Sequence, residues 1–118
     1  MNQKQISHSD LVLALTAFLV RELGNARPIG ARLKFVYLEG GTISIDGSGD
    51  INKVTSEDIA ADCTVTLASA VHASMLRFEL NQSEAFRMGK MRVQGELGVA
   101  LRLAPLLAHP FRLPGEAA

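Results

Sequence analysis

Two stretches of the chain decide its fold: ADCTVTL at residues 61–67 and AFRMGKMRVQG at residues 85–95. In the first stretch a Cys, a Val and a Leu alternate with two threonines. Alternation of apolar and polar residues is the period of a β-strand that buries one face. The first stretch therefore predicts a strand over 62–67 whose aliphatic side chains face a core.

The second stretch predicts a short helix, a chain reversal and another strand. Asn81, followed three residues later by Glu84, is a capping box that starts the helix. Gly89 supplies the left-handed conformation that ends the helix and turns the chain into a strand over 90–94. Gly95 ends that strand.

The chain upstream of these stretches predicts a helix followed by a β-hairpin. The helix is expected over 11–23, with Ser9 or Asp10 as its cap and a glycine at its end. Residues 32–38 and 42–46 have the β-branched, alternating composition of strands, and a Gly-Gly pair joins them.

Two further helices and a loop complete the expected order. The polar stretch 47–61 predicts a loop, and 70–78 predicts a helix capped by Ser69. Residues 97–107 predict a last helix that Pro105 kinks or restarts, because proline lacks a backbone N–H. A helix, then strands, then helices with one returning strand indicate an α+β domain.

The first helix is more apolar than one packing face requires. Its apolar residues are Leu11, Val12, Leu13, Leu15, Phe18, Leu19, Val20 and Leu23. They cover more than a single stripe, so either more of this domain or a second copy must cover the remainder. The second interpretation predicts a homodimer through the N-terminal helix, which a substitution such as Leu15→Glu would separate.

Composition bounds the class of protein. A chain of 118 residues has room for one domain, so we expect residues 1–118 to form a single unit. Hydrophobic residues make up 47% and Trp is absent, which indicates an aliphatic core. Twelve Lys and Arg balance twelve Asp and Glu, so the general attraction needed for nucleic acid is missing and no nucleic-acid partner is expected.

Charge and cysteine usage suggest a location and a partner. The later part of the chain is rich in basic residues: Arg87, Lys90, Arg92, Arg102 and Arg112. They form either a solvated face or a basic rim that makes transient contact with an anionic membrane. Cys63 is the single cysteine, so it cannot form an intramolecular disulfide; we expect it to be buried in a protein of the reducing cytoplasm.

Residues for catalysis or metal binding do not gather in the sequence. His8, His72 and His109 are scattered without a Cys or carboxylate at ligand spacing, so neither a metal nor another cofactor is expected. We expect His72 to be exposed or satisfied in the core. Ser69 and Ser74 lack a nucleophile-elbow sequence. The chain is therefore not expected to be an enzyme.

The two quoted stretches, with the helix between them and the aliphatic segment after them, resemble the sterol carrier protein 2 family. In that family an Ala-Asp strand of alternating Thr and aliphatic residues precedes a helix. A Phe and then Gly-Lys open the next strand, and a Gly closes it before an aliphatic C-terminal helix. Here these positions are Ala61–Asp62, Phe86, Gly89–Lys90, Gly95 and 97–107.

The resemblance implies a fold and a ligand. The fold is α+β, an antiparallel-dominated mixed sheet of about five strands covered on one side by helices that enclose an apolar tunnel. The ligand is a fatty acid, a sterol or an isoprenoid. The residues expected to bind it are apolar: Val71, Met75, Phe78, Phe86, Met88, Met91, Val93, Leu97, Leu101 and Leu107.

Several functions remain open at this point. The leading hypothesis is a non-catalytic lipid binding and transfer protein. The alternatives are a ligand-free protein-protein interaction or dimerisation module, and an accessory factor in isoprenoid-quinone biosynthesis. An enzyme acting on a bound lipid would need a positioned base, which the sequence does not reveal, and no polar anchor for a ligand can be identified.

Overall fold

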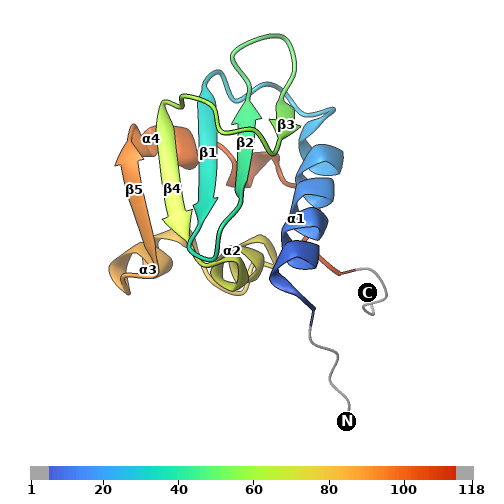
Figure 1. The fold of residues 1–118 in the computed structure, drawn as a ribbon. Coiled ribbons are helices and arrows are strands. Elements are labelled where there is room, and N and C mark those ends of the chain that lie inside the picture. The colour runs from blue at the N-terminus through green and yellow to red at the C-terminus, as the bar shows by residue number, and fades with distance from the viewer. Residues whose placement is uncertain (1–5, 114–118) are drawn as a thin grey trace.

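The computed structural model describes residues 6–113. Its strands form one mixed sheet in the order β3-β2-β1-β4-β5 (Figure 1). The strands are β1 (Arg32–Tyr37), β2 (Thr42–Asp46), β3 (Lys53–Thr55), β4 (Cys63–Leu67) and β5 (Met91–Gly95). Only the β1–β4 pair is parallel, and the other three pairs are antiparallel, so the expected antiparallel-dominated mixed sheet is confirmed.

Helices cover one face of this sheet. They are α1 (His8–Leu23), α2 (Ser69–Leu76), α3 (Gln82–Arg87), α4 (Leu97–Ala100) and a 3₁₀ turn, η1 (Ala104–Leu106). Figure 1 shows α1 beside the β3 edge, α2 and α3 at one end of the sheet, and α4 with the C-terminal segment behind it. In the described part of the chain, no helix is both long and apolar enough to cross a membrane.

The core lies between the sheet and these helices. On β1 the side chains of Leu33, Phe35 and Tyr37 are buried and alternate with more exposed neighbours. Val65 lies opposite Phe35 in the parallel pairing, and Cys63 is fully buried as expected. The alternation in the sequence therefore identified the inner face of these strands correctly.

The prediction of a continuous loop over 47–61 was wrong at β3. This edge strand contains one apolar residue, Val54, so a three-residue segment offers no alternation to detect. The chain then crosses the outer face of β2 and β1 on its way to β4. The Ser44 hydroxyl donates to the Glu57 carbonyl oxygen, and Lys34 Nζ lies 2.6 Å from Asp58 Oδ1. This crossing is what makes the β1–β4 pair parallel.

Helix α1 begins earlier than expected and buries one stripe. Ser7, rather than Ser9 or Asp10, is its cap, because the Ser7 hydroxyl accepts from the Asp10 N–H. Leu15 has no exposed surface, whereas Leu13 is 67% exposed and Val20 is 48% exposed. Leu15→Glu would therefore place a charge in the core and unfold the chain whether or not it dimerises. A substitution that tests dimerisation must instead change the exposed Leu13.

The expected helices after β4 were partly wrong. Ala68 rather than Ser69 precedes α2, and that helix ends at Leu76. The helix expected over 97–107 stops at Ala100, and a 3₁₀ turn follows that contains Pro105. Proline removes a backbone donor and disfavours the α-conformation of the residue before it, so an α-helix cannot continue through this point.

Candidate functional site

An apolar pocket lies between the sheet, α2 and the C-terminal segment. Its volume is about 260 Å³, and none of the described residues that line it is Asp, Glu, Lys or Arg. The lining residues are Phe35, Val65, His72, Met75, Leu76, Phe78, Leu80, Asn81, Gln82, Met91, Ala100, Leu103, Ala104 and Leu107. A concave, mostly apolar surface with few polar groups is the usual character of a small-molecule site.

The floor of the pocket is the inner face of the sheet. Phe35 on β1 and Val65 on β4 are register partners in the parallel pair. Met91 on β5 lies one strand further along, opposite Leu67. Because all three side chains point to the face that the helices cover, the pairing of β1, β4 and β5 gives the pocket a rigid base.

The C-terminal segment forms the roof, and a carboxylate on α1 holds that segment. Glu22 accepts from the backbone N–H groups of Ala108 (2.8 Å) and His109 (3.0 Å), and Glu22 Oε2 lies 3.0 Å from His109 Nδ1. Burial raises the pKa of Glu22, but these donors and the nearby imidazole outweigh it, so the pKa is lowered overall. Phe111 packs edge-on against Phe18 in the core.

Phe78 stands at the mouth of the pocket in a strained backbone conformation. It is 58% exposed and has a φ of 66°, in the left-handed region that favours glycine. Its N–H donates to the Met75 carbonyl oxygen, and the Glu79 N–H donates to the Ser74 carbonyl oxygen. This pair of hydrogen bonds is a Schellman motif that ends α2. Helix α3 ends in the same way with Gly89 in the equivalent position. The chain therefore tolerates backbone strain to place an aromatic ring at this mouth.

Glycine at position 78 should be better tolerated than alanine. Both Phe78→Gly and Phe78→Ala remove the ring, but only alanine keeps a Cβ in the left-handed region. We expect the Gly variant to be about 1 kcal/mol more stable than the Ala variant, the reverse of their order within a helix. Urea unfolding of the two variants measures this difference. An Ala variant of equal or greater stability would mean that the position is not left-handed in solution.

His72 is the buried polar residue of the pocket wall. It is 1% exposed, its ring stacks on Phe35 at 4.2 Å between centroids, and its Nδ1 lies 2.7 Å from Tyr37 Oη. Burial lowers the pKa of His72 to about 3 and raises that of Tyr37 well above its usual value. Both groups are therefore neutral at physiological pH. Of the two expected placements for His72, the structure supports the core.

The buried imidazole should make stability depend on pH. The unfolded chain takes up a proton at His72 below about pH 6.5, whereas the folded chain excludes it down to about pH 3. The stability that the folded state has relative to a protonated His72 in the unfolded chain is therefore fully present above pH 6.5, and it is lost progressively as the pH falls from about 6.5 to about 3. Between pH 7 and 5 we expect wild-type stability to fall by about 2 kcal/mol more than that of His72→Phe. Urea unfolding at both pH values tests this, and equal losses would contradict it.

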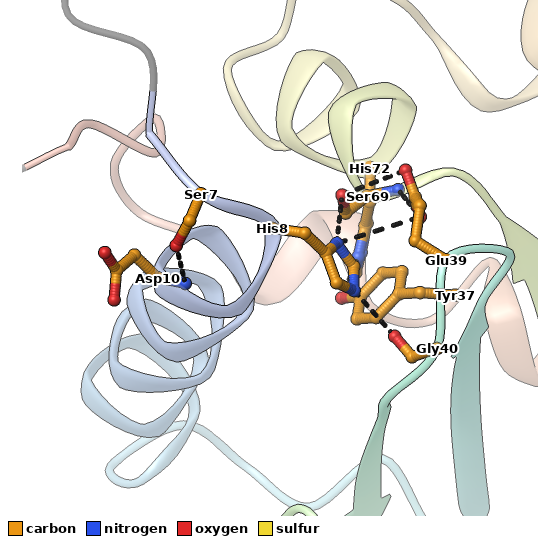
Figure 2. Close-up of polar contacts among 8 residues, drawn as sticks. All are labelled: Ser7, His8, Asp10, Tyr37, Glu39, Gly40, Ser69 and His72. Atoms are coloured by element: carbon orange, nitrogen blue, oxygen red, sulfur yellow. Dashed lines mark hydrogen bonds and ion pairs between the residues drawn. The ribbon is translucent and has the colours of Figure 1, made fainter.

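Ser69, His8 and Glu39 come together from α2, α1 and the hairpin, as Figure 2 shows. His8 Nδ1 lies 3.0 Å from Ser69 Oγ, and His8 Nε2 lies 2.7 Å from the Gly40 carbonyl oxygen. Glu39 accepts from the Ser69 N–H at 3.1 Å. Glu39 Oε1 also lies 3.9 Å from His8 Nδ1, which is within ion-pair range but too long for a hydrogen bond, and Ser69 is buried. These contacts tie three elements together without forming a nucleophile-base-acid relay.

The structure brings together four of the ten residues expected to bind ligand. Met75, Phe78, Met91 and Leu107 line the pocket. Val71 and Val93 are half-buried against the core and do not line it. The other four are exposed on the surface: Phe86, Met88, Leu97 and Leu101. Helix α3 and the four-residue α4 are too short to bury all their apolar residues, so an apolar residue type did not indicate the pocket there.

Sequence analysis missed Phe35, Val65 and His72. The strand alternation placed Phe35 and Val65 on an inner face, and that signal could have suggested them. Nothing in the sequence indicated that His72 lines a pocket or that the Ser69 cluster forms, because their partners lie thirty or more residues away. Among residues 6–113 no cluster of His, Cys, Asp or Glu has the geometry of a metal site.

The sequence model of the SCP-2 sterol transfer family matches residues 22–108. The chain belongs to this family. Every residue that lines the pocket falls within the matched region. Sterol carrier protein 2 of Homo sapiens and that of Gallus gallus are each 31% identical to the chain over 65 residues, which is 55% of this chain. These matches span 12% of the length of either relative.

Solved structures share the fold. The sterol carrier protein domain 2 of Helicoverpa armigera has a TM-score of 0.71 and 22% identity, covering 89% of this chain and 91% of that one. The UbiJ-SCP2 ubiquinone synthesis protein has a TM-score of 0.63 and 20% identity, with coverages of 86% and 93%. The Aedes aegypti sterol carrier protein 2 complex with palmitate has a TM-score of 0.62 and 20% identity, with coverages of 89% and 97%. The expected α+β family fold is confirmed.

Proposed function

We propose that this SCP-2 family member binds a lipid whose hydrocarbon part occupies the apolar pocket, and that it carries this lipid rather than transforming it. The observation that supports this most directly is the lining: of the fourteen residues that line the pocket in the described part of the chain, eleven are apolar and none is Asp, Glu, Lys or Arg. Each methylene group removed from water contributes about 0.8 kcal/mol, so a chain of carbons binds here without a strong polar contact.

The size of the pocket indicates how a long ligand would fit. Its volume of about 260 Å³ lies just below the range of roughly 300–1,000 Å³ usual for small-molecule sites. A long chain would occupy it only if side chains moved or if part of the ligand extended past Phe78. Met75 and Met91 are unbranched and adapt easily, so we propose that they widen the pocket into the tunnel that the family resemblance implies.

Displacement of a fluorescent fatty acid tests this proposal. We expect saturable binding of one probe per chain, and native mass spectrometry of the purified protein should show a retained lipid. Protein free of bound lipid that also fails to saturate with any alkyl probe would contradict it.

Relatives and fold neighbours suggest which lipids to test first. The matched family is named for sterol transfer, and one neighbour of the same fold was solved with palmitate. Another is named as a ubiquinone synthesis protein, which fits an accessory role in isoprenoid-quinone biosynthesis. Deleting the gene and measuring quinone intermediates separates this role from general lipid transfer: accumulated intermediates support the accessory role, and unchanged levels oppose it.

A dimer through α1 is a second proposal, and it rests on two exposed side chains. Leu13 and Val20 lie on the outer face of α1. Leu13→Glu should lower the sedimentation coefficient if a second copy covers this face, and it should leave probe binding intact. An unchanged, monomeric sedimentation profile in the wild type would remove the proposal.

Transient membrane contact is a further proposal, supported by the surface of α3. Phe86 is 54% exposed and Met88 is 51% exposed, and the basic residues Arg87 and Lys90 flank them. An apolar pair beside positive charge suits an anionic lipid surface. Cosedimentation with vesicles that contain an anionic lipid should fall when Phe86 and Met88 are replaced by Ser. Equal cosedimentation with neutral vesicles would contradict the charge argument.

A further inference from the structure

One nitrogen of the His72 ring opens onto the pocket without a partner. Nδ1 is occupied by Tyr37 Oη at 2.7 Å, and within the described residues Nε2 has no hydrogen-bond partner. Every side-chain nitrogen or oxygen that residues 6–113 enclose completely does have one. Nε2 is therefore not enclosed, and the space beside His72 is the pocket that its ring lines.

The partner of Nδ1 fixes which nitrogen carries the proton. Tyr37 is 2% exposed, and among residues 6–113 its hydroxyl has His72 Nδ1 as its hydrogen-bond partner. If Nδ1–H donated to the hydroxyl, the hydroxyl proton would be left without an acceptor in the core. The hydroxyl therefore donates to Nδ1, and the single proton of the neutral imidazole lies on Nε2. Nε2–H is then an unused donor that faces an apolar cavity.

The surroundings of this donor decide what it can bind. A carboxylate at this depth would need a cation beside it, and the part of the lining that residues 6–113 provide contains neither Lys nor Arg. The imidazole is itself neutral, because burial holds the pKa of His72 far below physiological pH. A carbonyl or hydroxyl oxygen needs only one donor, which Nε2–H supplies.

We propose that His72 Nε2–H is the polar anchor of the pocket and donates to the neutral carbonyl or hydroxyl oxygen of a lipid that enters with that oxygen first. This rests on the proposed function, since it requires that a lipid occupies the pocket. It predicts that neutral ketones and alcohols bind better than ionised fatty acids of equal length. It also makes His72 a residue that determines specificity rather than a core residue alone.

Matched ligands and variants test the anchor. Four ligands of equal chain length compete with one fluorescent alkyl probe: a methyl ketone, a primary alcohol, a carboxylate and the hydrocarbon. His72→Phe keeps a ring against Phe35 but removes the donor. We expect it to weaken ketone and alcohol binding about five- to tenfold and to change hydrocarbon binding less than twofold. Gln82→Leu, which removes the half-buried amide of the lining, should weaken ketone and alcohol binding less than His72→Phe does.

A spectroscopic measurement on the wild-type chain does not depend on the folding of a variant. Nitrogen-15 NMR of labelled histidine should show the Nε2–H form of His72 in the free protein, and added ketone should shift the Nε2 and Hε2 signals. The Nδ1–H form, or signals unmoved by a ketone that displaces the probe, would overturn the anchor. Loss of ketone affinity in Gln82→Leu but not in His72→Phe would also overturn it, because the ligand oxygen would then lie beside Gln82 and not beside His72.

The same data separate the two proposals. If neither the probe nor any of the four ligands binds the wild type, the proposed function fails, and the anchor fails with it. If all four bind with no preference for the ketone or alcohol, lipid binding stands and only the anchor is overturned.

Discussion

Ala100→Phe should weaken binding of a long-chain probe about 30-fold. Ala100 on α4 is 5% exposed and lines the pocket. A phenyl ring at this position would take the place of two or three methylene groups of the ligand. At about 0.8 kcal/mol each this is a loss of about 2 kcal/mol, which corresponds to the expected change in Kd. Probe titration of the variant measures it.

Leu101→Phe is the matched control for this variant. Leu101 is the next residue along the chain, is 53% exposed and does not line the pocket. It receives the same aromatic ring, so its probe affinity should stay within twofold of the wild type. Overpacking at Ala100 should itself cost about 1–3 kcal/mol of stability, so thermal unfolding must show that the variant is folded. A folded Ala100→Phe that binds like the wild type would place the ligand elsewhere.

Gly95→Ala should lower the free energy of unfolding by about 3–5 kcal/mol, a large part of the stability of a small domain. Gly95 ends β5 with a φ of 93°, which an L-residue adopts only with strain. A Cβ placed there would also lie 2.3 Å from the Asp62 carbonyl oxygen. The same oxygen accepts a hydrogen bond from the Glu96 N–H, so the backbone cannot move away from the added Cβ without losing that hydrogen bond. Urea unfolding measures the loss.

Substitutions at two other glycines distinguish the effect of the Cβ clash at Gly95 from the effect of its positive φ. Gly89 has a φ of 72° but nothing within 4 Å of a Cβ, so Gly89→Ala should cost only about 1–2 kcal/mol. Gly98 lies in α4 without either restriction, and Gly98→Ala should stabilise the chain by about 0.5–1 kcal/mol. If Gly95→Ala were no worse than Gly89→Ala, the close approach to Asp62 would not exist in solution.

The inner face of the sheet and the endings of α3 and β5 could be predicted because their signals are local. Alternation along β4 depends on the geometry of one strand, and it identified Cys63 and Val65 as buried. Gly89 has the left-handed φ that was expected of it, and Gly95 ends β5 as expected. Strand β3 was missed because three residues with one apolar side chain show no alternation, and the last helix was predicted too long because its helical apolar pattern continues past Ala100.

The candidate site was predicted only in part, because an apolar residue type does not say what an apolar residue contacts. Phe86 and Met91 lie only five residues apart and both were expected to bind ligand. Phe86 is 54% exposed on α3, whereas Met91 is buried on β5 and lines the pocket. Only the direction in which each element presents its residues to the rest of the fold separates them.

The sequence by itself determined the α+β class and the inner face of the strands, since periodicity and glycine conformation are properties of short segments, and the resemblance of two stretches to known relatives indicated the family. The tertiary structure alone decided where the pocket lies and that His72 faces it. Both depend on distances between segments far apart in the chain: β1 pairs with β4 across the intervening hairpin, and Tyr37 occupies one nitrogen of an imidazole that lies 35 residues away. A pattern along one segment shows which face is buried, but whether that face meets another side chain or a cavity is fixed by how closely the segments pack.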